Sequence, residues 1–455
     1  MLIANSIVVL ILFLQHEAFY LLPKQLLVAP GVFRMADASL VAMPFFALSV
    51  PKTISRYSEE SLLVISFLLM MFLSCLMGSL FFPQSYYEGI LNIRNNFVWA
   101  SFFAFIPLIG NLEQAERLVK FLTFLTGIYV LLLLVTKYFP GLGLIHLPKN
   151  VYDKGSTLLR FGEHRLFFPY GNIPLMFFFI ALAQSVNGDM KEGGAAKAMR
   201  LAFMFVVLNA VVYSMTRAVI YPVLAAVVFA FITAKSRNIK FAGIAIGVLL
   251  ICFQVLSTSI SSTGSSPFEG TLLGKMLLKS DELSSEDGRV NQARMYLTQF
   301  ARSPVTGVGN FAIGKYTKYQ DAVAQTVRAY GFFNGSDLGY LKMVGENGLL
   351  GVAWLLWWFS YYYRRGRQTL ARARQVGGAP FAEVLTRGLL YFTVYILISG
   401  VTLGHWVHHN MLTILPLSLA LMAIARVSLD ETCAAPVPVR QPARPFPAAQ
   451  RGLLT

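Results

Sequence analysis

The chain has 455 residues, of which 56% are hydrophobic and only 13% carry a charged side chain. A soluble globular protein averages roughly 25% charged residues, so this composition excludes a water-soluble globular protein and indicates that lipid surrounds much of the chain. The formal net charge of +16 does not indicate a nucleic-acid partner, because the basic residues fall mainly in short segments between apolar runs, where they set membrane topology.

Apolar runs long enough to cross a bilayer recur along the chain. A transmembrane helix needs roughly 20 apolar residues, and we predict an all-α, polytopic membrane protein with about twelve such helices. We interpret the first run as a membrane helix and not as a removable signal, since it lacks a basic leader and a small-residue cleavage site. The predicted spans are 2–22, 26–50, 61–82, 97–111, 117–139, 166–186, 199–216, 218–234, 239–257, 338–363, 386–404 and 406–427.

These spans divide the chain into consecutive regions. Residues 1–257 are predicted to hold the first nine transmembrane helices, and residues 258–337 to form one large loop that contains short helices. The last three transmembrane helices occupy residues 338–427. Residues 428–455 are rich in Pro, Ala and Arg, a composition from which we expect a disordered tail.

The large loop contains about 80 residues, and a connection of this length usually has a function of its own. Its acidic run at 285–287 is typical of a helix start. Apolar residues at helical spacing follow between Arg289 and Arg302, and Pro304 ends the pattern. We therefore predict a helix that begins near residue 285 and ends before Pro304.

The short loops predict the orientation in the membrane. Lys and Arg concentrate in alternate loops, and the positive-inside rule places these loops in the cytoplasm. Both termini are then cytoplasmic and the large loop is periplasmic. The basic loops contain Lys52, Arg56, Arg117, Lys120, Lys191, Lys197, Arg200, Lys235, Arg237, Lys240, Arg364, Arg365, Arg367, Arg372 and Arg374.

Several polar residues fall in the segments that this topology places at the periplasmic face. Charged groups at membrane depth are costly, and they tend to pair with one another or to line substrate pathways. We therefore consider these residues candidates for a functional site. They are Arg160, Glu163, His164, Arg165, Arg217, Arg289, Arg294, Arg302, Arg328, Asp337, His405, His408 and His409.

Arg217 and Asp337 each allow two interpretations. Arg217 has no acidic neighbour in the sequence, so it is either an interfacial residue that reaches the lipid head groups or a guanidinium that binds a phosphate. Asp337 is either the N-cap of the following helix or a carboxylate that accepts a proton from a sugar hydroxyl. The residues by themselves leave both pairs of alternatives open.

The histidines near residue 405 suggest a metal site, because His405 and His409 have an i, i+4 spacing. No Asp, Glu or Cys lies near them in the sequence. We therefore favour no metal here. The histidines are either interfacial residues or hydrogen-bonding partners of a substrate, and His405 is the candidate for the second role.

Short motifs in the region 217–351 resemble those of the O-antigen ligase/polymerase superfamily, and the layout of the whole chain is similar to that of the family. The motifs are Ser214-Met215-Thr216-Arg217-Ala218 between two spans, Asp287-Gly288-Arg289, Ala293-Arg294 and the run 303–311 in the large loop, and Ser336-Asp337-Leu338-Gly339-Tyr340-Leu341 followed by 345–351 where the chain re-enters the membrane.

The resemblance implies metal-independent glycosyl transfer at the periplasmic face of the bacterial inner membrane, with no cofactor. Members of the family move a glycan from an undecaprenyl-diphosphate carrier to a hydroxyl of another carrier-linked repeat unit, of lipid A-core or of a protein. The partners it implies are the carrier-linked donor and acceptor, membrane lipid, a flippase and a chain-length regulator.

The acceptor is suggested by one departure from the ligase pattern. Ligases of this family carry a histidine in the large loop near the re-entry, whereas residues 258–337 contain none. The Asp-Leu-Gly-Tyr re-entry is more similar to Wzy-type polymerases, so we favour polymerisation of O-antigen, capsule or exopolysaccharide. An O-antigen ligase or a protein O-oligosaccharyltransferase is the alternative within the superfamily. A membrane transporter is the alternative from another class, although no internal repeat supports it.

The resemblance and the chemistry of a diphosphate leaving group together suggest roles for the polar residues. We expect Arg217 and Arg165 to stabilise the departing diphosphate and Asp337 to act as the base, which makes these three the candidate catalytic residues. The candidate substrate-binding residues are Arg160, Arg289, Arg294, Arg328, Tyr340 and His405.

Overall fold

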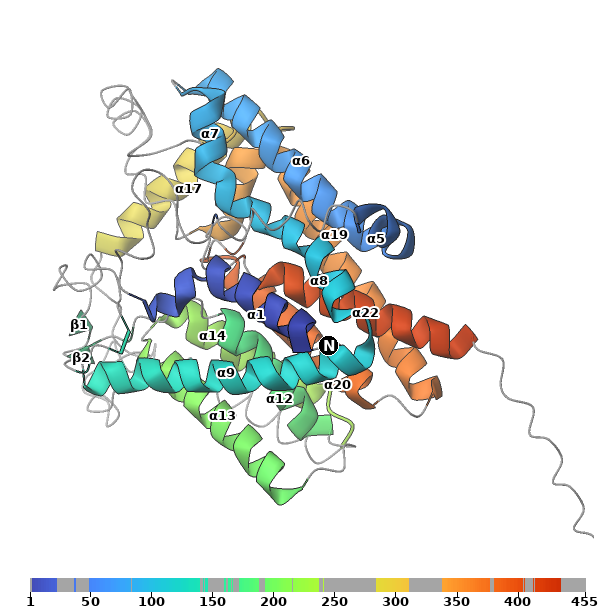
Figure 1. Cartoon of the computed structure of the whole chain (residues 1–455). Coiled ribbons are helices and arrows are strands. Elements are labelled where there is room, and N and C mark those ends of the chain that lie inside the picture. Colours follow the sequence, from blue (N-terminus) through green and yellow to red (C-terminus); the bar gives the residue numbers. More distant parts are fainter. Residues whose placement is uncertain are drawn as a thin grey trace, which may run out of the picture.

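A computed structural model describes a helical protein whose elements pack against one another (Figure 1). The residues that the structure describes are 2–22, 37, 49–82, 84–139, 142, 144–145, 159–160, 163–164, 166, 172–187, 193–214, 216–236, 240, 284–310, 338–376, 380–403, 405, 412 and 414–434. Within these ranges the regular structure is helical apart from two short strands, β1 (Leu159–Arg160) and β2 (Glu163–His164), which pair antiparallel.

Most of the longer described helices follow the apolar runs of the sequence, whereas α17 (Ser284–Arg302) is mainly polar. The described helices are α1 (Leu2–Gln15), η1 (Glu17–Tyr20), α5 (Val50–Arg56), α6 (Ser58–Phe81), α7 (Tyr86–Ile93), η2 (Arg94–Ala100), α8 (Ser101–Ile109), α9 (Leu112–Tyr138), α12 (Asn172–Asn187), α13 (Gly194–Tyr213), α14 (Arg217–Ile232), α17, α19 (Gly339–Val376), α20 (Pro380–Ser399) and α22 (Leu415–Ala434).

Among the described residues, the helices α6, α9, α13 and α20 are long and apolar enough to cross a membrane. Each overlaps a predicted span. The helices α1, α12 and α14 also contain apolar stretches, but these are shorter. The predicted spans at 26–50 and 239–257 lie largely outside the described residues, so the count of about twelve remains a prediction.

The largest differences from the predicted bounds are in α19 and α22. α19 continues to Val376, so the basic residues after 363 lie on a helix and not in a loop. Arg364 and Arg365 on this extension pair with Glu59 at the start of α6, at 2.9 Å and 2.5 Å. α22 begins at Leu415 and continues to Ala434, which is later than predicted at both ends.

Most of the ion pairs among the described residues gather at one end of the helices. Glu60 at the start of α6 is fully buried, binds Arg426 of α22 at 2.9 Å and accepts a hydrogen bond from the Tyr361 hydroxyl at 2.6 Å. Arg387 pairs with Glu383 near the start of α20 at 3.0 Å. This end carries the basic segments that the sequence assigns to the cytoplasm. In Figure 1, α5 and the end of α22 lie on the right, whereas α17 and the strands lie on the left.

An aromatic cluster holds α6, η2 and α19 together. The ring of Phe67 lies 5.0 Å from that of Trp99 and 4.7 Å from that of Trp354, measured between centroids. Aromatic pairs at such distances each contribute about 0.5–1.5 kcal/mol beyond the area they bury. Trp354 also donates its indole N–H to the carbonyl of Leu63 at 3.0 Å. Ring packing and this hydrogen bond together therefore orient α19 against α6.

α19 is broken at Gly348, whose backbone angles are φ 58° and ψ −148°. A break in a helix leaves backbone carbonyls without their usual partners. The segment that follows α17 supplies them: Val308 donates its N–H to the carbonyl of Gly345 at 3.1 Å, and Gly309 donates to that of Glu346 at 2.9 Å. The segment of the large loop that follows α17 is therefore attached to the first part of α19.

Candidate functional site

The end of the helices opposite the ion pairs brings together segments that are distant in the sequence. Arg387 near the start of α20 donates to the carbonyl of Thr233, just after α14, at 3.2 Å. Asn187 at the end of α12 donates to the Tyr391 hydroxyl at 3.5 Å. These two contacts join the C-terminal ends of α14 and α12 to the first half of α20. Since both helices pack along α20, they run antiparallel to it, and their N-termini lie beside its C-terminus.

We call the residues that meet there the outer-end cluster, and it consists of Asn172, Tyr340, Ser399 and His405. The start of α19 belongs to it because Tyr340 donates its backbone N–H to the carbonyl of Gly400 at 3.0 Å. The structure therefore brings Tyr340 and His405, two of the predicted site residues, to the same corner.

His405 is fully buried at the centre of this cluster. Its Nδ1 lies 3.0 Å from the side-chain nitrogen of Asn172, and its Nε2 lies 2.5 Å from the Ser399 hydroxyl. The Ser399 hydroxyl in turn donates to the carbonyl of Tyr395 at 2.6 Å. With Asn172 as donor, Nδ1 accepts and the Nε2–H group donates, which defines a neutral tautomer. This arrangement favours a role for His405 in holding α12 against α20.

Tyr340 attaches the start of α19 to the end of α20. Its hydroxyl donates to the carbonyl of Leu397 at 2.7 Å, one of the last carbonyls of α20, which have no partner within the helix. Gly400 is required beside it, because an added Cβ there would lie 2.5 Å from the Tyr340 hydroxyl. The hydroxyl is thus used to cap a helix in this structure.

The junction between α13 and α14 lies at the same end. Leu166 donates its N–H to the carbonyl of Tyr213 at 2.8 Å, which connects the segment before α12 to the end of α13. Arg217 is the first residue of α14, and the carbonyl of Thr216 accepts the N–H groups of Val219 and Ile220 at 2.9 Å and 3.0 Å. The first amides of α14 therefore face the outer end and create a positive potential there.

A second polar group of residues surrounds Asn310, at the end of the segment that docks on α19. The Gln84 side chain donates to the Asn310 carbonyl at 2.6 Å, and the Asn92 side-chain amide donates to the Asn310 side-chain oxygen. Glu346 is buried beside this segment and pairs with Lys342 at 3.6 Å. Sequence reasoning missed Asn310, Glu346 and Lys342 as site candidates, although ionisable residues in an apolar re-entry are a signal for them.

Buried amide oxygens lie between α17 and α19. The side-chain oxygens of Gln292, Gln299 and Asn347 have no hydrogen-bond partner within the part of the chain that the structure describes. Each such group costs about 1–3 kcal/mol when it stays unpaired in a folded protein. These three oxygens can therefore accept hydrogen bonds from water or from the hydroxyl groups of a ligand. The i, i+7 spacing of Gln292 and Gln299, which places them on one helix face, was the sequence signal for this polar face.

The other predicted site residues fall into distinct groups. Arg294 is exposed on α17, away from the face that packs on α19. Arg160 lies on β1 opposite Glu163, and Arg217 and Arg289 lie on helices, but the structure does not describe their side chains. Arg165, Arg328, Asp337, His408 and His409 lie outside the described residues.

The described residues contain no group of three His, Cys, Asp or Glu side chains arranged to hold a metal ion. The polar groups that do meet at the outer end are amides, hydroxyls, a histidine and a tyrosine. Such groups can orient a polar ligand through hydrogen bonds.

The apolar helices, with polar groups at one end and ion pairs at the other, define a multi-pass helical membrane protein. Residues 202–356 match the family model described as O-Antigen ligase, which confirms the resemblance to the O-antigen ligase/polymerase superfamily that the sequence motifs predicted. The match begins in α13 and ends in α19, so it includes Arg217, Arg289, Asp337 and Tyr340. No curated protein matches the chain.

Proposed function

We propose that this protein is a glycosyltransferase that polymerises undecaprenyl-diphosphate-linked oligosaccharide repeat units. The observation that carries the proposal is the match of residues 202–356 to the O-antigen ligase family. The fold supports it, because the start of α14 at Arg217 and the start of α19 at Gly339 both lie beside the C-terminus of α20. Two motifs from opposite ends of the matched segment thus reach one end of the molecule.

The donor side of the reaction requires positive charge. As the bond between the anomeric carbon and the diphosphate breaks, the electron pair leaves with the diphosphate oxygen, and fixed cations there stabilise the transition state more than the ground state. Arg217 and Arg165 supply guanidinium groups, which match phosphate oxygens two at a time. The first amides of α14 add to the same positive potential.

The acceptor side requires a base. The acceptor hydroxyl oxygen forms the new bond to the anomeric carbon, and its proton passes to the carboxylate of Asp337. Holding both reactants in place accounts for much of the acceleration in such a two-substrate reaction. Arg160, Arg289, Arg294 and Arg328 are proposed to contact the glycans or their phosphates. Tyr340 and His405, whose side chains bond within the protein, are proposed to position the elements around the substrate.

The location follows from the charge distribution. The ion-paired end carries the basic segments, and the positive-inside rule assigns that end to the cytoplasm. The outer-end cluster then faces the periplasm of the bacterial inner membrane, and both termini are cytoplasmic. A flippase that delivers the lipid-linked repeat unit and a chain-length regulator are the proposed protein partners.

A ligase of the same superfamily is the second candidate, because the matching family model is described as O-Antigen ligase. The two activities share the donor and differ in the acceptor. A polymerase transfers to a second carrier-linked repeat unit, whereas a ligase transfers to lipid A-core. The absence of histidine from residues 258–337 is our reason for favouring the polymerase.

The test uses a strain in which the chromosomal gene for this protein is deleted and either the wild-type chain or the Arg217→Ala variant is expressed. We expect wild type to restore long polymer and Arg217→Ala to leave single repeat units, at equal amounts of folded protein in the membrane. Arg367→Ala is the matched control, because Arg367 is an exposed arginine of the ion-paired end that contacts Tyr363 at 3.0 Å.

The products separate the candidates. Normal polymer from Arg217→Ala removes this residue from the mechanism. Polymer that stays on the carrier beside undecorated lipid A-core in the deletion strain identifies a ligase. Energy-dependent accumulation of a labelled solute in vesicles, with no effect on glycans, identifies a transporter. For the base, Asp337→Asn is expected to lose activity, and activity in Asp337→Asn but not in Asp337→Ala assigns this residue to helix capping.

A further inference from the structure

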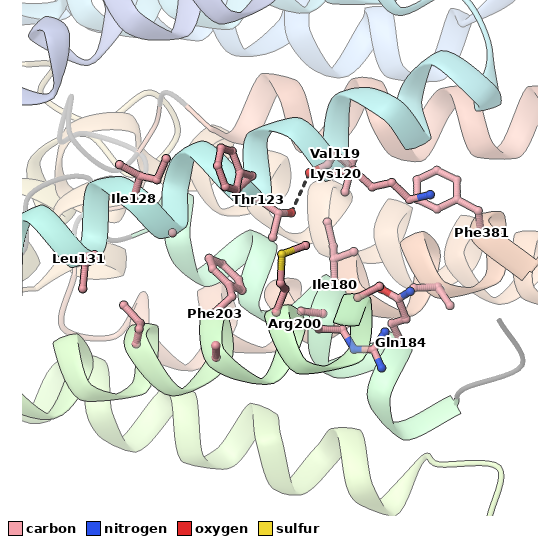
Figure 2. A pocket seen from close by; sticks show the side chains of 18 residues that line it. Val119, Lys120, Thr123, Ile128, Leu131, Ile180, Gln184, Arg200, Phe203 and Phe381 are labelled. Carbon is pink, nitrogen blue, oxygen red and sulfur yellow. Dashed lines mark hydrogen bonds between the residues drawn. The ribbon is translucent and has the colours of Figure 1, made fainter. Parts of the chain in front are cut away.

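A cavity of about 480 Å³ lies between α9, α12, α13 and α20 (Figure 2). Its size falls within the range of small-molecule sites, roughly 300–1,000 Å³. Most of its lining is apolar, with Ile128, Leu131, Ile180, Phe203 and Phe381 among the side chains that form the walls. This cavity is separate from the outer-end cluster and plays no part in the proposed reaction.

The cavity opens toward the lipid between α9 and α13. The side chains along its mouth are exposed, including Phe124 and Leu131 on α9 and Met199 on α13. In a membrane, exposed apolar side chains face acyl chains rather than water. A lipid can therefore reach the mouth of this cavity without leaving the bilayer, and we call the cavity the lipid-facing groove.

Polar side chains line one end of the groove. Lys120, Gln184 and Arg200 lie on the right in Figure 2, whereas Ile128 and Leu131 lie on the left. Arg200 donates its Nε–H to the hydroxyl of Ser185 at 3.0 Å, and Lys120 pairs with Glu116 at 2.7 Å. Both cations thus have a defined position at the rim of an apolar channel.

The length of the groove corresponds to one leaflet. The stretch of α9 from Lys120 to Leu131 is about 16 Å long at about 1.5 Å per residue. This is about half of the roughly 30 Å hydrocarbon core of a bilayer. The basic rim lies near the start of α9 and α13, at the end of the molecule that we assign to the cytoplasm.

We infer that this groove binds an anionic glycerophospholipid of the cytoplasmic leaflet. Its acyl chains occupy the apolar channel, and its phosphate contacts Arg200 and Lys120. Glu116 balances the charge of Lys120, so Arg200 supplies the net positive charge at the rim that matches an anionic head group. The depth matches an acyl chain of one leaflet. The undecaprenyl carrier does not fit this assignment, because its diphosphate is needed at the outer-end cluster and not at the basic rim.

The experiment titrates the purified full-length protein in detergent with dioleoylphosphatidylglycerol or dioleoylphosphatidylcholine and counts bound lipids by native mass spectrometry. We expect tighter binding of phosphatidylglycerol. Arg200→Ala should weaken this binding about fivefold, the loss expected for one basic contact to an anionic lipid. Lys197→Ala is the matched control, because Lys197 is exposed on the same helix but does not line the groove.

A second pair of variants tests the channel itself. Ala202 lines the groove and is exposed, so Ala202→Trp fills the channel without disturbing the packed interior. It should abolish the phosphatidylglycerol adduct, whereas Ala198→Trp, at an exposed position on the same helix outside the groove, should retain it. Unchanged binding in Ala202→Trp overturns the proposal. Equal affinity for the two phospholipids, or displacement of phosphatidylglycerol by undecaprenyl phosphate, overturns the assigned occupant.

Discussion

Leu349 donates its backbone N–H to the carbonyl of Pro304 at 2.8 Å, and this bond joins α19 to the segment that follows α17. Leu350 makes the equivalent bond with Val305 at 3.1 Å. Both amides lie just after the break at Gly348, where a continuous helix would have provided their acceptors. The segment after α17 therefore provides partners for the carbonyls before the break and for the amides after it. These bonds attach the large loop to α19 at Gly348.

Gly348→Ala is expected to weaken this anchor. A side chain at φ 58° and ψ −148° is strained, which costs about 1–3 kcal/mol. The added Cβ would also lie 2.5 Å from the Pro304 carbonyl and 2.6 Å from the Gly307 nitrogen. We expect a lower thermal unfolding midpoint in detergent and faster proteolysis after α17. The control is Gly194→Ala, where an added Cβ meets nothing within 4 Å; equal midpoints for the two variants would contradict this account.

His405→Ala is expected to destabilise the outer-end cluster. The substitution leaves the buried Asn172 amide without its histidine partner, which costs about 1–3 kcal/mol, and it adds a cavity. The measurement is the unfolding midpoint together with activity per folded molecule. If His405 positions α12 and α20, we expect the unfolding midpoint and the activity per folded molecule to fall together. An inactive variant with a wild-type midpoint would instead assign His405 to substrate contact.

Tyr340→Phe removes the hydroxyl that caps Leu397 and keeps the ring. We expect a modest loss of stability, about 0.5–1.5 kcal/mol, the usual net contribution of one hydrogen bond. The polymer length made by the variant should match that of wild type, because the hydroxyl is committed to a backbone carbonyl. A strong loss of activity at unchanged stability would show that this hydroxyl also serves the substrate.

The proposed orientation can be checked by labelling cysteines with a membrane-impermeant maleimide. Cys433 near the end of α22 is exposed, whereas Cys75 is buried. In a Cys252→Ser background we expect Cys433 to react only after the membrane is permeabilised. Leu297→Cys, at an exposed position of α17, should react in intact spheroplasts once Cys433 is replaced by serine. The reverse pattern would invert the topology and move the outer-end cluster to the cytoplasm.

The helix α17 shows how far the sequence alone could predict the candidate site. Its helical period and its end before Pro304 were predicted, and α17 ends at Arg302. Two of the apolar residues at this helical spacing do not pack against α19, since Val290 and Leu297 are 50% and 52% exposed. The buried face contains Gln292 and Gln299, and Gly345 lets α17 approach α19 closely at Tyr296 and Gln299. The period of apolar residues in the sequence identifies a helix, but the helix that packs against it decides which of its faces is buried.

By itself the sequence determined that this is a multi-pass membrane protein and where most of the described helices lie, because each span is a local run of apolar residues whose transfer into lipid is favourable in any fold. It also carried the motifs of the superfamily. Only the tertiary structure decided that α19 breaks at Gly348, that His405 binds Asn172 and Ser399, and that a lipid-facing groove ends at Arg200. These features depend on contacts between residues far apart in the chain, which a local pattern does not contain.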